Sequence, residues 1–247
     1  MVEPKKRIPE EYDYYKTYIP QGGLELPRKL FHCSIGFLVV YLYTHGVTRE
    51  DVYPILSLAL SIVYSGELLR FNFEWFNKIY CKVLGSIMRP TEVRDRLNGT
   101  VYYLIGCIVA LYFFPTDLAA LSILYLSWAD PIASLIGRSF GKYTPKIGGS
   151  HSKKSLAGSL AALVTGALVT YLYFGTSPFA MCATSYNALL SIVPLWVLSL
   201  YGGLVAAFSE GVSDLCPYLA NVDDNLSIPV ISVVLLWIPL VWLRLGS

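Results

Sequence analysis

Apolar runs long enough to cross a bilayer recur along the whole chain, and they constrain its fold more than any other feature. A helix of about 20 residues spans the hydrocarbon core of a membrane. Runs close to this length occur at 28–45, 52–70, 100–115, 118–137, 155–174, 188–208 and 227–244. Because helices satisfy their own backbone hydrogen bonds in lipid, the expected fold is all-α, a polytopic membrane bundle of about seven transmembrane helices, with six or eight as alternatives.

Composition supports a membrane protein and excludes some partners. Of the 247 residues, 55% are hydrophobic and 15% are charged, which is more apolar surface than a soluble domain of this size buries. The net charge of +2 is too small to indicate a nucleic-acid partner. Residues 1–26 are polar and lack the apolar core of a signal peptide, so they are interpreted as a cytosolic tail before one membrane domain at 27–247.

The basic residues predict an orientation. With the N-terminus in the cytosol, the cytosolic segments 1–27, 71–99, 138–154 and 209–226 hold nearly all Lys and Arg, whereas the opposite loops hold Arg49 alone. Segment 71–90 has apolar residues at helical spacing opposite polar ones, which predicts an amphipathic helix in the membrane interface beside a lipid entry route. A packed connector helix without a substrate role fits the same pattern.

The stretch from Trp128 to Ala161 places a carboxylate inside an apolar run and a glycine- and lysine-rich loop directly after it. Asp130 would be costly in a span unless it faces a polar cavity, a cation or a metal ion, so it is a candidate functional residue. Lys153, Lys154 and Ser155 precede the next helix, whose free N–H groups would form an anion site. The Walker A spacing is absent, so a P-loop fold is not indicated.

Charged residues also gather near other helix ends. A helix beginning at Pro27 would put Arg28, Lys29 and His32 on one face as phosphate contacts, although the two cations could instead snorkel to lipid headgroups. Glu67 and Arg70 are three residues apart, which favours an intrahelical ion pair. Along the helix after Ser155, small residues at four-residue spacing (Gly158, Ala162 and Gly166) favour close helix packing.

An acidic cluster near the last span could bind a divalent cation. Its members are Glu210, Asp214, Asp223 and Asp224. Carboxylate oxygens suit Mg²⁺ or Ca²⁺, which would bridge the protein to nucleotide phosphates. A solvated acidic loop is the alternative.

Taken in order, these clusters resemble the CTP-dependent diacylglycerol kinases of fungi, members of the polyprenol kinase family that includes dolichol and phytol kinases. The resemblance covers about Pro27 to Pro229. The matching pieces are PRKLFHCSIGFLVVYLYT, the Asn-Gly before the third span, LSWADPIASLIGR, KSLAGSLAA, and GGLVAAFSEG followed by DDNLSIPV. The central piece is also similar to CDP-diacylglycerol synthases, but Leu156-Ala157-Gly158-Ser159 lacks the acid which that family carries there.

The resemblance implies transfer of the γ-phosphoryl group of CTP to diacylglycerol at the endoplasmic reticulum and nuclear envelope, on the cytosolic side. It implies a divalent cation, Mg²⁺ or Ca²⁺, and membrane lipid as a partner, while the oligomeric state stays open. Catalytic roles are expected for Asp130, His32 and Lys154, with the general base open between His32 and a carboxylate. Nucleotide or substrate contacts are expected from Arg28, Lys29, Asn98, Gly137, Arg138, Lys153, Ser155 and Gly158. Metal binding is expected from Asp130, Asp214, Asp223 and Asp224.

Three other functions fit parts of the sequence. The acceptor could be dolichol or phytol, although dolichol kinases tend to carry additional N-terminal spans. The reaction could be cytidylyl transfer, as in CDP-diacylglycerol synthases. A small transporter using Asp130 and Glu67 as ion sites would need charges accessible from both sides, whereas here they gather on one predicted face.

Overall fold

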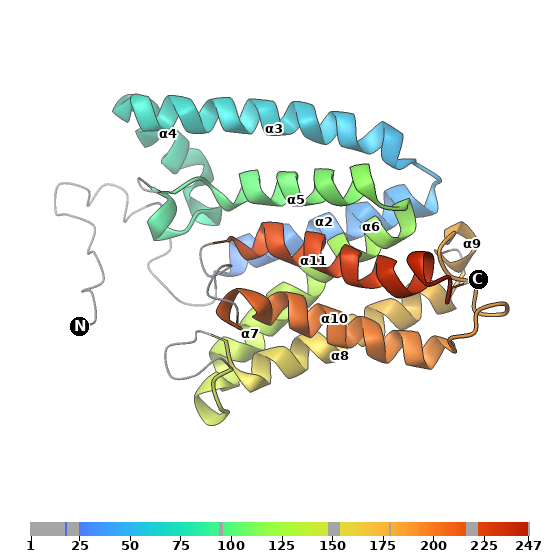
Figure 1. The fold of residues 1–247 in the computed structure, drawn as a ribbon. Helices are drawn as coiled ribbons and strands as arrows, with labels where there is room; N and C mark the ends of the chain where they lie inside the picture. Colours follow the sequence, from blue (N-terminus) through green and yellow to red (C-terminus); the bar gives the residue numbers. More distant parts are fainter. Residues whose placement is uncertain are drawn as a thin grey trace.

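The fold is a bundle of long helices, as the apolar runs predict (Figure 1). The computed structural model describes Tyr18 and residues 25–93, 96–147, 154–177, 179–215 and 222–246, with only the backbone of 214 and 215. The α-helices are α2 (Leu26–Thr44), α3 (Arg49–Asn72), α4 (Glu74–Leu84), α5 (Gly99–Phe113), α6 (Thr116–Leu124), α7 (Asp130–Phe140), α8 (Leu156–Gly175), α9 (Phe179–Cys182), α10 (Leu195–Leu215) and α11 (Asp224–Trp237). Within those ranges there is no β-strand, only an isolated bridge between Lys146 and Ser155.

The expected number of seven spans is not confirmed. Each expected range overlaps a helix, but five helical segments are both long and apolar enough to cross a membrane. They are Arg49–Asn72, Thr116–Tyr143, Leu156–Gly175, Leu195–Ser213 and Asp224–Trp242. Helix α5 is apolar but has only 15 residues, and α2 carries Arg28, Lys29 and His32 in its first two turns. The sixth expected range, 188–208, is also displaced, because α10 begins after Pro194 and continues to Leu215.

A π-helical turn directly precedes Asp130. Helices α6 and α7 form one rod, joined by the π-helical segment Tyr125–Ala129. Pro131 cannot donate a backbone hydrogen bond, and its ring would clash with the carbonyl four residues earlier in a regular α-helix. The wider turn accommodates this proline, and such π turns are frequent at functional sites.

Small residues bring the central helices close together. A Cβ added at Gly166 of α8 would collide with Ala206 of α10, and one added at Gly203 would lie 2.5 Å from the Leu163 carbonyl oxygen. A Cβ at Gly158 would lie 3.0 Å from the carbonyl oxygen of Ala133 in α7. The packing face predicted along α8 is therefore confirmed.

Helix α3 lies at the edge of the bundle. It contacts α5 and α4, and Figure 1 shows it along one side with α5 between it and the other helices. Most of its large apolar side chains are exposed, including Ile55, Leu58 and Ile62, as expected of a lipid-facing helix. Helix α4 crosses near one end of α3 and also leaves apolar side chains exposed, among them Trp75 and Val83.

The helix ends divide into two groups. Helix α4 and the starts of α5 and α11 lie at one end of the bundle, at the left in Figure 1, whereas α9 and the C-terminus lie at the other. The first end contains the segments in which the sequence concentrates Lys and Arg. Lys154, Arg28 and Asp223 lie at the same end, close to the starts of α8, α2 and α11.

Candidate functional site

Lys154 is at the centre of a charged cluster. It stands just before α8, where the chain is held by Ile147 N–H donating to the Lys154 carbonyl and by Leu156 N–H donating to the Pro145 carbonyl. Its Nζ donates to Glu210 Oε1 at 2.7 Å and to Asp224 Oδ2 at 2.9 Å. Burial opposes the charge, but Asp224 and Glu210 outweigh it and raise the pKa of the Lys154 ammonium. Lys154 therefore stays a cation.

Asp130 faces this cluster. It lies within electrostatic range of Lys154, Asp224 and Glu210, yet its carboxylate accepts no hydrogen bond from any described residue. Glu210 likewise has one buried oxygen, Oε2, without a partner in the described part of the chain. Two carboxylates on separate helices thus keep free oxygen atoms beside a lysine.

Lys29 brings an unpaired ammonium close to the same place. Its Nζ is buried and has no hydrogen-bond partner among the described residues. Asp130, Glu25 and Arg138 are the charges that influence it, which places it between the start of α2 and helix α7. Arg138 is itself more exposed, and its Nη2 donates to Glu25 Oε1 at 2.8 Å. A buried ammonium without a partner is suited to an anionic ligand.

A chain of paired charges forms the next part of the site. Arg28 Nη1 donates to Glu92 Oε1 at 3.2 Å, and Glu92 Oε2 accepts from the Arg89 backbone N–H at 3.0 Å. The Arg89 guanidinium donates to Asp223 Oδ2 at 2.8 Å, and Asp223 Oδ1 caps α11 by accepting from the Asn225 N–H. These contacts join α2, the segment before α5, and the start of α11.

His32 lies one turn beyond Arg28 on α2. It is buried, and its ring packs edge-on against Tyr103 with 5.3 Å between ring centroids. The charged groups that act on the His32 ring electrostatically are Arg28, Arg89 and Asp223. Its ring makes no hydrogen bond with a described residue.

Asn98 connects this cluster to a second buried ion pair. Its backbone N–H donates to Glu67 Oε2 at 2.8 Å, its Oδ1 caps α5, and its buried Nδ2 has no partner among the described residues. Glu67 and Arg70 form the predicted intrahelical ion pair, with 2.6 Å between Arg70 Nη2 and Glu67 Oε2 and neither side chain exposed. The arginine also donates to the Val93 and Arg96 carbonyls. This pair supports the backbone that leads into α5.

The predicted small residues have packing partners. Ser155 caps α8, because its Oγ accepts from the Gly158 N–H at 3.3 Å. A Cβ added at Gly137 would lie 3.3 Å from that Oγ, and one added at Gly141 would lie 2.7 Å from it. Gly137, Ser155 and Gly158 thus allow α7 to pack against the start of α8, next to Lys154. The predicted contact of these three residues with nucleotide stays a prediction.

The structure gives two of the predicted metal ligands other partners. Asp223 pairs with Arg89 and caps α11, and Asp224 accepts from both Lys154 and Ser213. No group of three or more His, Cys, Asp or Glu able to hold a metal ion occurs among the residues searched. Lys153 and the Asp214 side chain lie outside the described residues, so their predicted roles stay predictions.

Arg89 and Glu92 were not among the predicted site residues. Glu92 ends the short helical turn Pro90–Glu92, and Arg89 directly precedes that turn. Both belong to a segment of mixed charge between α4 and α5. Only the alternation of opposite charges there hinted at ion pairing. Their partners lie far away in the chain, since Arg28 and Asp223 come from the first and last parts of the domain.

Comparison with known proteins gives relatives over nearly the whole chain. It is 39% identical over 232 residues to CTP-dependent diacylglycerol kinase 1 of Saccharomyces cerevisiae, an alignment that covers 90% of this chain and 75% of that protein. It is 38% identical over 217 residues to CTP-dependent diacylglycerol kinase 1 of Schizosaccharomyces pombe, covering 87% and 93%. Probable phytol kinase 2 of Glycine max is 24% identical over 205 residues, covering 82% and 64%. Neither a family model nor a solved structure matches the chain.

Proposed function

This chain belongs to the family of CTP-dependent diacylglycerol kinases, and we propose that it transfers the γ-phosphoryl group of CTP to the hydroxyl of diacylglycerol, giving phosphatidate and CDP. The observation that carries the proposal is the identity of 38% over 93% of the length of the fission-yeast kinase. The phytol kinases are more distant, which favours diacylglycerol over a polyprenol as the acceptor.

The reaction forms one bond to phosphorus and breaks another. The oxygen of the diacylglycerol hydroxyl bonds to the γ-phosphorus, the bond from that phosphorus to the β–γ bridging oxygen breaks, and CDP leaves. Catalysis of such a transfer consists mainly of positioning and charge neutralisation. The buried ammonium of Lys29 and the ammonium of Lys154 are placed to bind phosphate oxygens, with Arg28 beside them.

The hydroxyl proton needs an acceptor within reach. The His32 ring and the Asp130 carboxylate both lack hydrogen-bond partners among the described residues, so each can accept a proton. They differ in their surroundings, since His32 packs on Tyr103 near the arginines, whereas Asp130 faces Lys154. A pH–rate profile that keeps its acidic limb in His32→Gln and loses it in Asp130→Asn would assign the base to Asp130, and the reverse would assign it to His32.

The free oxygens suit a divalent cation. Asp130 and the unpartnered Glu210 Oε2 are carboxylate ligands of the kind that Mg²⁺ and Ca²⁺ prefer. Mg²⁺ is commonly bound by one or two carboxylates together with substrate phosphates, which fits a site with two free carboxylates. When bound, such a cation would neutralise phosphate charge during transfer. Asp130 and Glu210 are therefore the proposed metal ligands.

The proposal includes a location. The site lies at the end of the bundle where the chain concentrates Lys and Arg, as expected of the cytosolic side. We place the protein in the endoplasmic reticulum membrane and nuclear envelope, with the site facing the cytosol.

Labelled CTP tests the reaction directly. Purified protein in mixed micelles with diacylglycerol should transfer label from the γ-phosphate of CTP to lipid and should transfer none from the α-phosphate. Label from the α-phosphate in lipid would instead indicate cytidylyl transfer. Phytol and dolichol serve as competing acceptors, and equal rates with them would overturn the choice of diacylglycerol. Full activity of Asp130→Ala would overturn the site assignment.

A further inference from the structure

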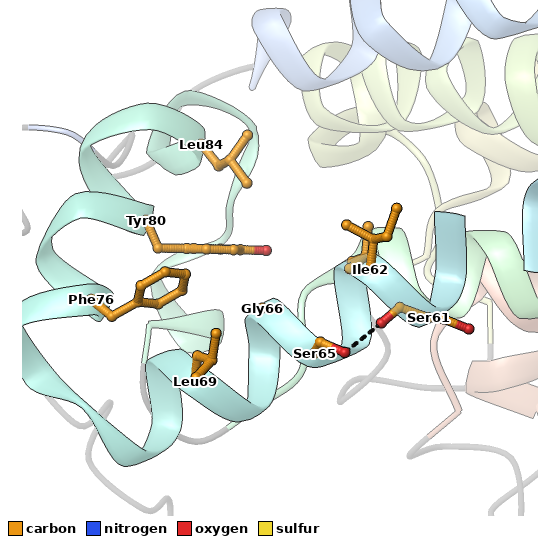
Figure 2. A pocket seen from close by; sticks show the side chains of 9 residues that line it. Ser61, Ile62, Ser65, Gly66, Leu69, Phe76, Tyr80 and Leu84 are labelled. Atoms are coloured by element: carbon orange, nitrogen blue, oxygen red, sulfur yellow. Dashed lines mark hydrogen bonds between the residues drawn. The ribbon is translucent and has the colours of Figure 1, made fainter. Parts of the chain in front are cut away.

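An apolar groove separates α3 from α4. It has a volume of about 600 Å³ and is lined by side chains of both helices, among them Ile62, Leu69, Phe76, Tyr80 and Leu84. Figure 2 shows Tyr80 extending from α4 toward α3, with Phe76 and Leu84 to either side of its ring. Ligand sites for small molecules have volumes of about 300–1,000 Å³, so the groove is large enough for part of a lipid.

The groove offers almost no polar group to a ligand. The two serines that line it use their hydroxyls within α3, where Ser61 Oγ donates to the Ser57 carbonyl and Ser65 Oγ to the Ser61 carbonyl. Helix α3 is one of the candidate spans, and its apolar side chains face outward. A hydrocarbon chain in the surrounding lipid would therefore enter without losing hydrogen bonds, whereas a nucleotide would find no partner.

One wall of the groove is shared with the charged cluster. Gly66, which lines the groove, is followed directly by Glu67, and the Glu67 carboxylate accepts from the Asn98 N–H. The Tyr80 hydroxyl lies close to the Glu67 carboxylate and to the Asn98 side chain. The next residue, Gly99, is so close to Arg28 that an added Cβ would lie 2.5 Å from its Nη2. The Glu67–Asn98 contact thus links one wall of the groove to the backbone beside Arg28.

The buried amide of Asn98 also lacks a ligand. Asn98 is 2% exposed, and its Nδ2 has no hydrogen-bond partner among the described residues. An acceptor such as a glycerol or ester oxygen would satisfy it. Because Asn98 neighbours Tyr80, which lines the groove, an oxygen-bearing molecule bound to this amide would lie beside the groove.

We propose that the groove between α3 and α4 holds an acyl chain of the acceptor lipid, with the glycerol end directed past Asn98 toward Arg28 and Lys29. This inference rests on the proposed function, because it gives that function its lipid subsite. It makes the groove a determinant of acceptor affinity and of chain-length preference, separate from the residues that bind CTP.

Two adjacent leucines provide a matched test. Leu69 lines the groove and is 44% exposed, whereas Leu68 is 48% exposed and does not line it. Leu69→Trp should fill the groove and raise the KM for long-chain diacylglycerol about tenfold, since small changes in an apolar pocket have effects of this size. The KM for CTP should not change, and Leu68→Trp should resemble the unmodified protein. Equal diacylglycerol KM values for the two variants would overturn the proposal.

Gly66 offers a graded version. An alanine Cβ there would lie 3.6 Å from the Tyr80 ring, an ordinary contact, so Gly66→Ala should fold and bind lipid normally. Gly66→Leu should reach into the groove and reproduce the effect of Leu69→Trp. The increase in the KM for diacylglycerol should be smaller when the acyl chains of the acceptor are short.

Photolabelling of the unmodified protein gives a result that does not depend on variants folding. Diacylglycerol with a photoreactive group at the end of one acyl chain should label peptides covering 61–69 and 76–84, and unlabelled diacylglycerol should compete while phosphatidylcholine should not. Labelling that phosphatidylcholine removes equally well would mean that bulk lipid fills the groove, and would overturn the proposal. Failure of the proposed function is a different result, namely no transfer of γ-label from CTP to diacylglycerol by the unmodified protein.

Discussion

Removing the ammonium of Lys154 should destabilise the fold as well as abolish activity. Lys154→Met keeps much of the side-chain volume but leaves Glu210 and Asp224 without their shared partner. The exposed fractions are 16% for the Lys154 side chain, 7% for Glu210 and 23% for Asp224, so water can replace little of the lost interaction. The carboxylate of Asp130 adds to the repulsion.

The size of the effect follows from the burial. Breaking a buried pair by removing one partner costs about 3–5 kcal/mol. Because Asp224 retains some contact with water and also accepts from Ser213, we expect about 3 kcal/mol. For a chain of this length that corresponds to a fall of about 6–12 °C in the thermal midpoint. Adding Glu210→Gln and Asp224→Asn to Lys154→Met should recover most of the loss, since no unpaired carboxylate of the pair then remains.

The pH dependence has a definite sign. The pKa of Lys154 is raised above its ordinary value of 10.5, so its contribution is fully present below that value and is lost only as pH rises above it. The unmodified protein should therefore show no change from this group between about pH 6 and about pH 9.

Thermal unfolding in detergent measures this stability. Lys142→Met is the matched control, because Lys142 is exposed, lies over the Tyr143 ring and has no ion pair with a described residue. The control should change the midpoint by less than about 2 °C. If Lys154→Met and Lys142→Met have the same midpoint, Lys154 does not neutralise Glu210 and Asp224, and the central contact of the site is wrong.

Three further predictions concern other parts of the site and bundle. Asp130→Asn should fold normally but raise the cation concentration needed for half-maximal activity about tenfold or more, measured by titrating the assay with Mg²⁺, and an unchanged titration would contradict its role as a ligand. Arg28→Ala should cost about 3 kcal/mol because Glu92 is left buried without its cation, with only the Arg89 backbone N–H as donor, and a double-mutant cycle with Glu92→Ala should recover part of the loss if the pair is coupled. Gly166→Val should lower the thermal midpoint through its clash with Ala206, by about 1–3 kcal/mol, and a midpoint equal to that of Gly66→Ala would contradict the packing of α8 on α10.

Local patterns predicted the helices and some of the site. Each expected span overlaps a helix because apolar length is a property of a continuous segment. The Glu67–Arg70 pair was predictable because its members lie one turn apart on a single helix. The number of membrane spans was harder to predict. Helix α5 is short, and α2 begins with charged residues, so hydropathy alone does not decide whether either helix crosses the membrane.

Tertiary contacts could not be predicted from local patterns. Lys154 pairs with Glu210 and Asp224, and Arg89 pairs with Asp223, across helices whose adjacency depends on packing of small residues. The sequence placed Asp223 and Asp224 with a metal ion because carboxylates near basic loops suit one. In the structure both carboxylates fix α11 to the rest of the site, and their role as metal ligands stays a prediction.

The balance of charge explains why the nucleotide would need a cation. Among the described residues, the cations that surround Asp130 and the start of α11 include Arg28, Lys29, Arg89, Arg138 and Lys154, and each of these five except Lys29 has a carboxylate partner. A triphosphate adds several negative charges to a cluster in which Asp130 accepts no hydrogen bond from a described residue and Glu210 shares Lys154 with Asp224. Lys29 alone cannot offset both, so the nucleotide must either bring a divalent cation to those carboxylates or separate Lys154 from its partners. Because separation would leave two buried carboxylates unpaired at about 3 kcal/mol, entry of the nucleotide together with its cation is the less costly course.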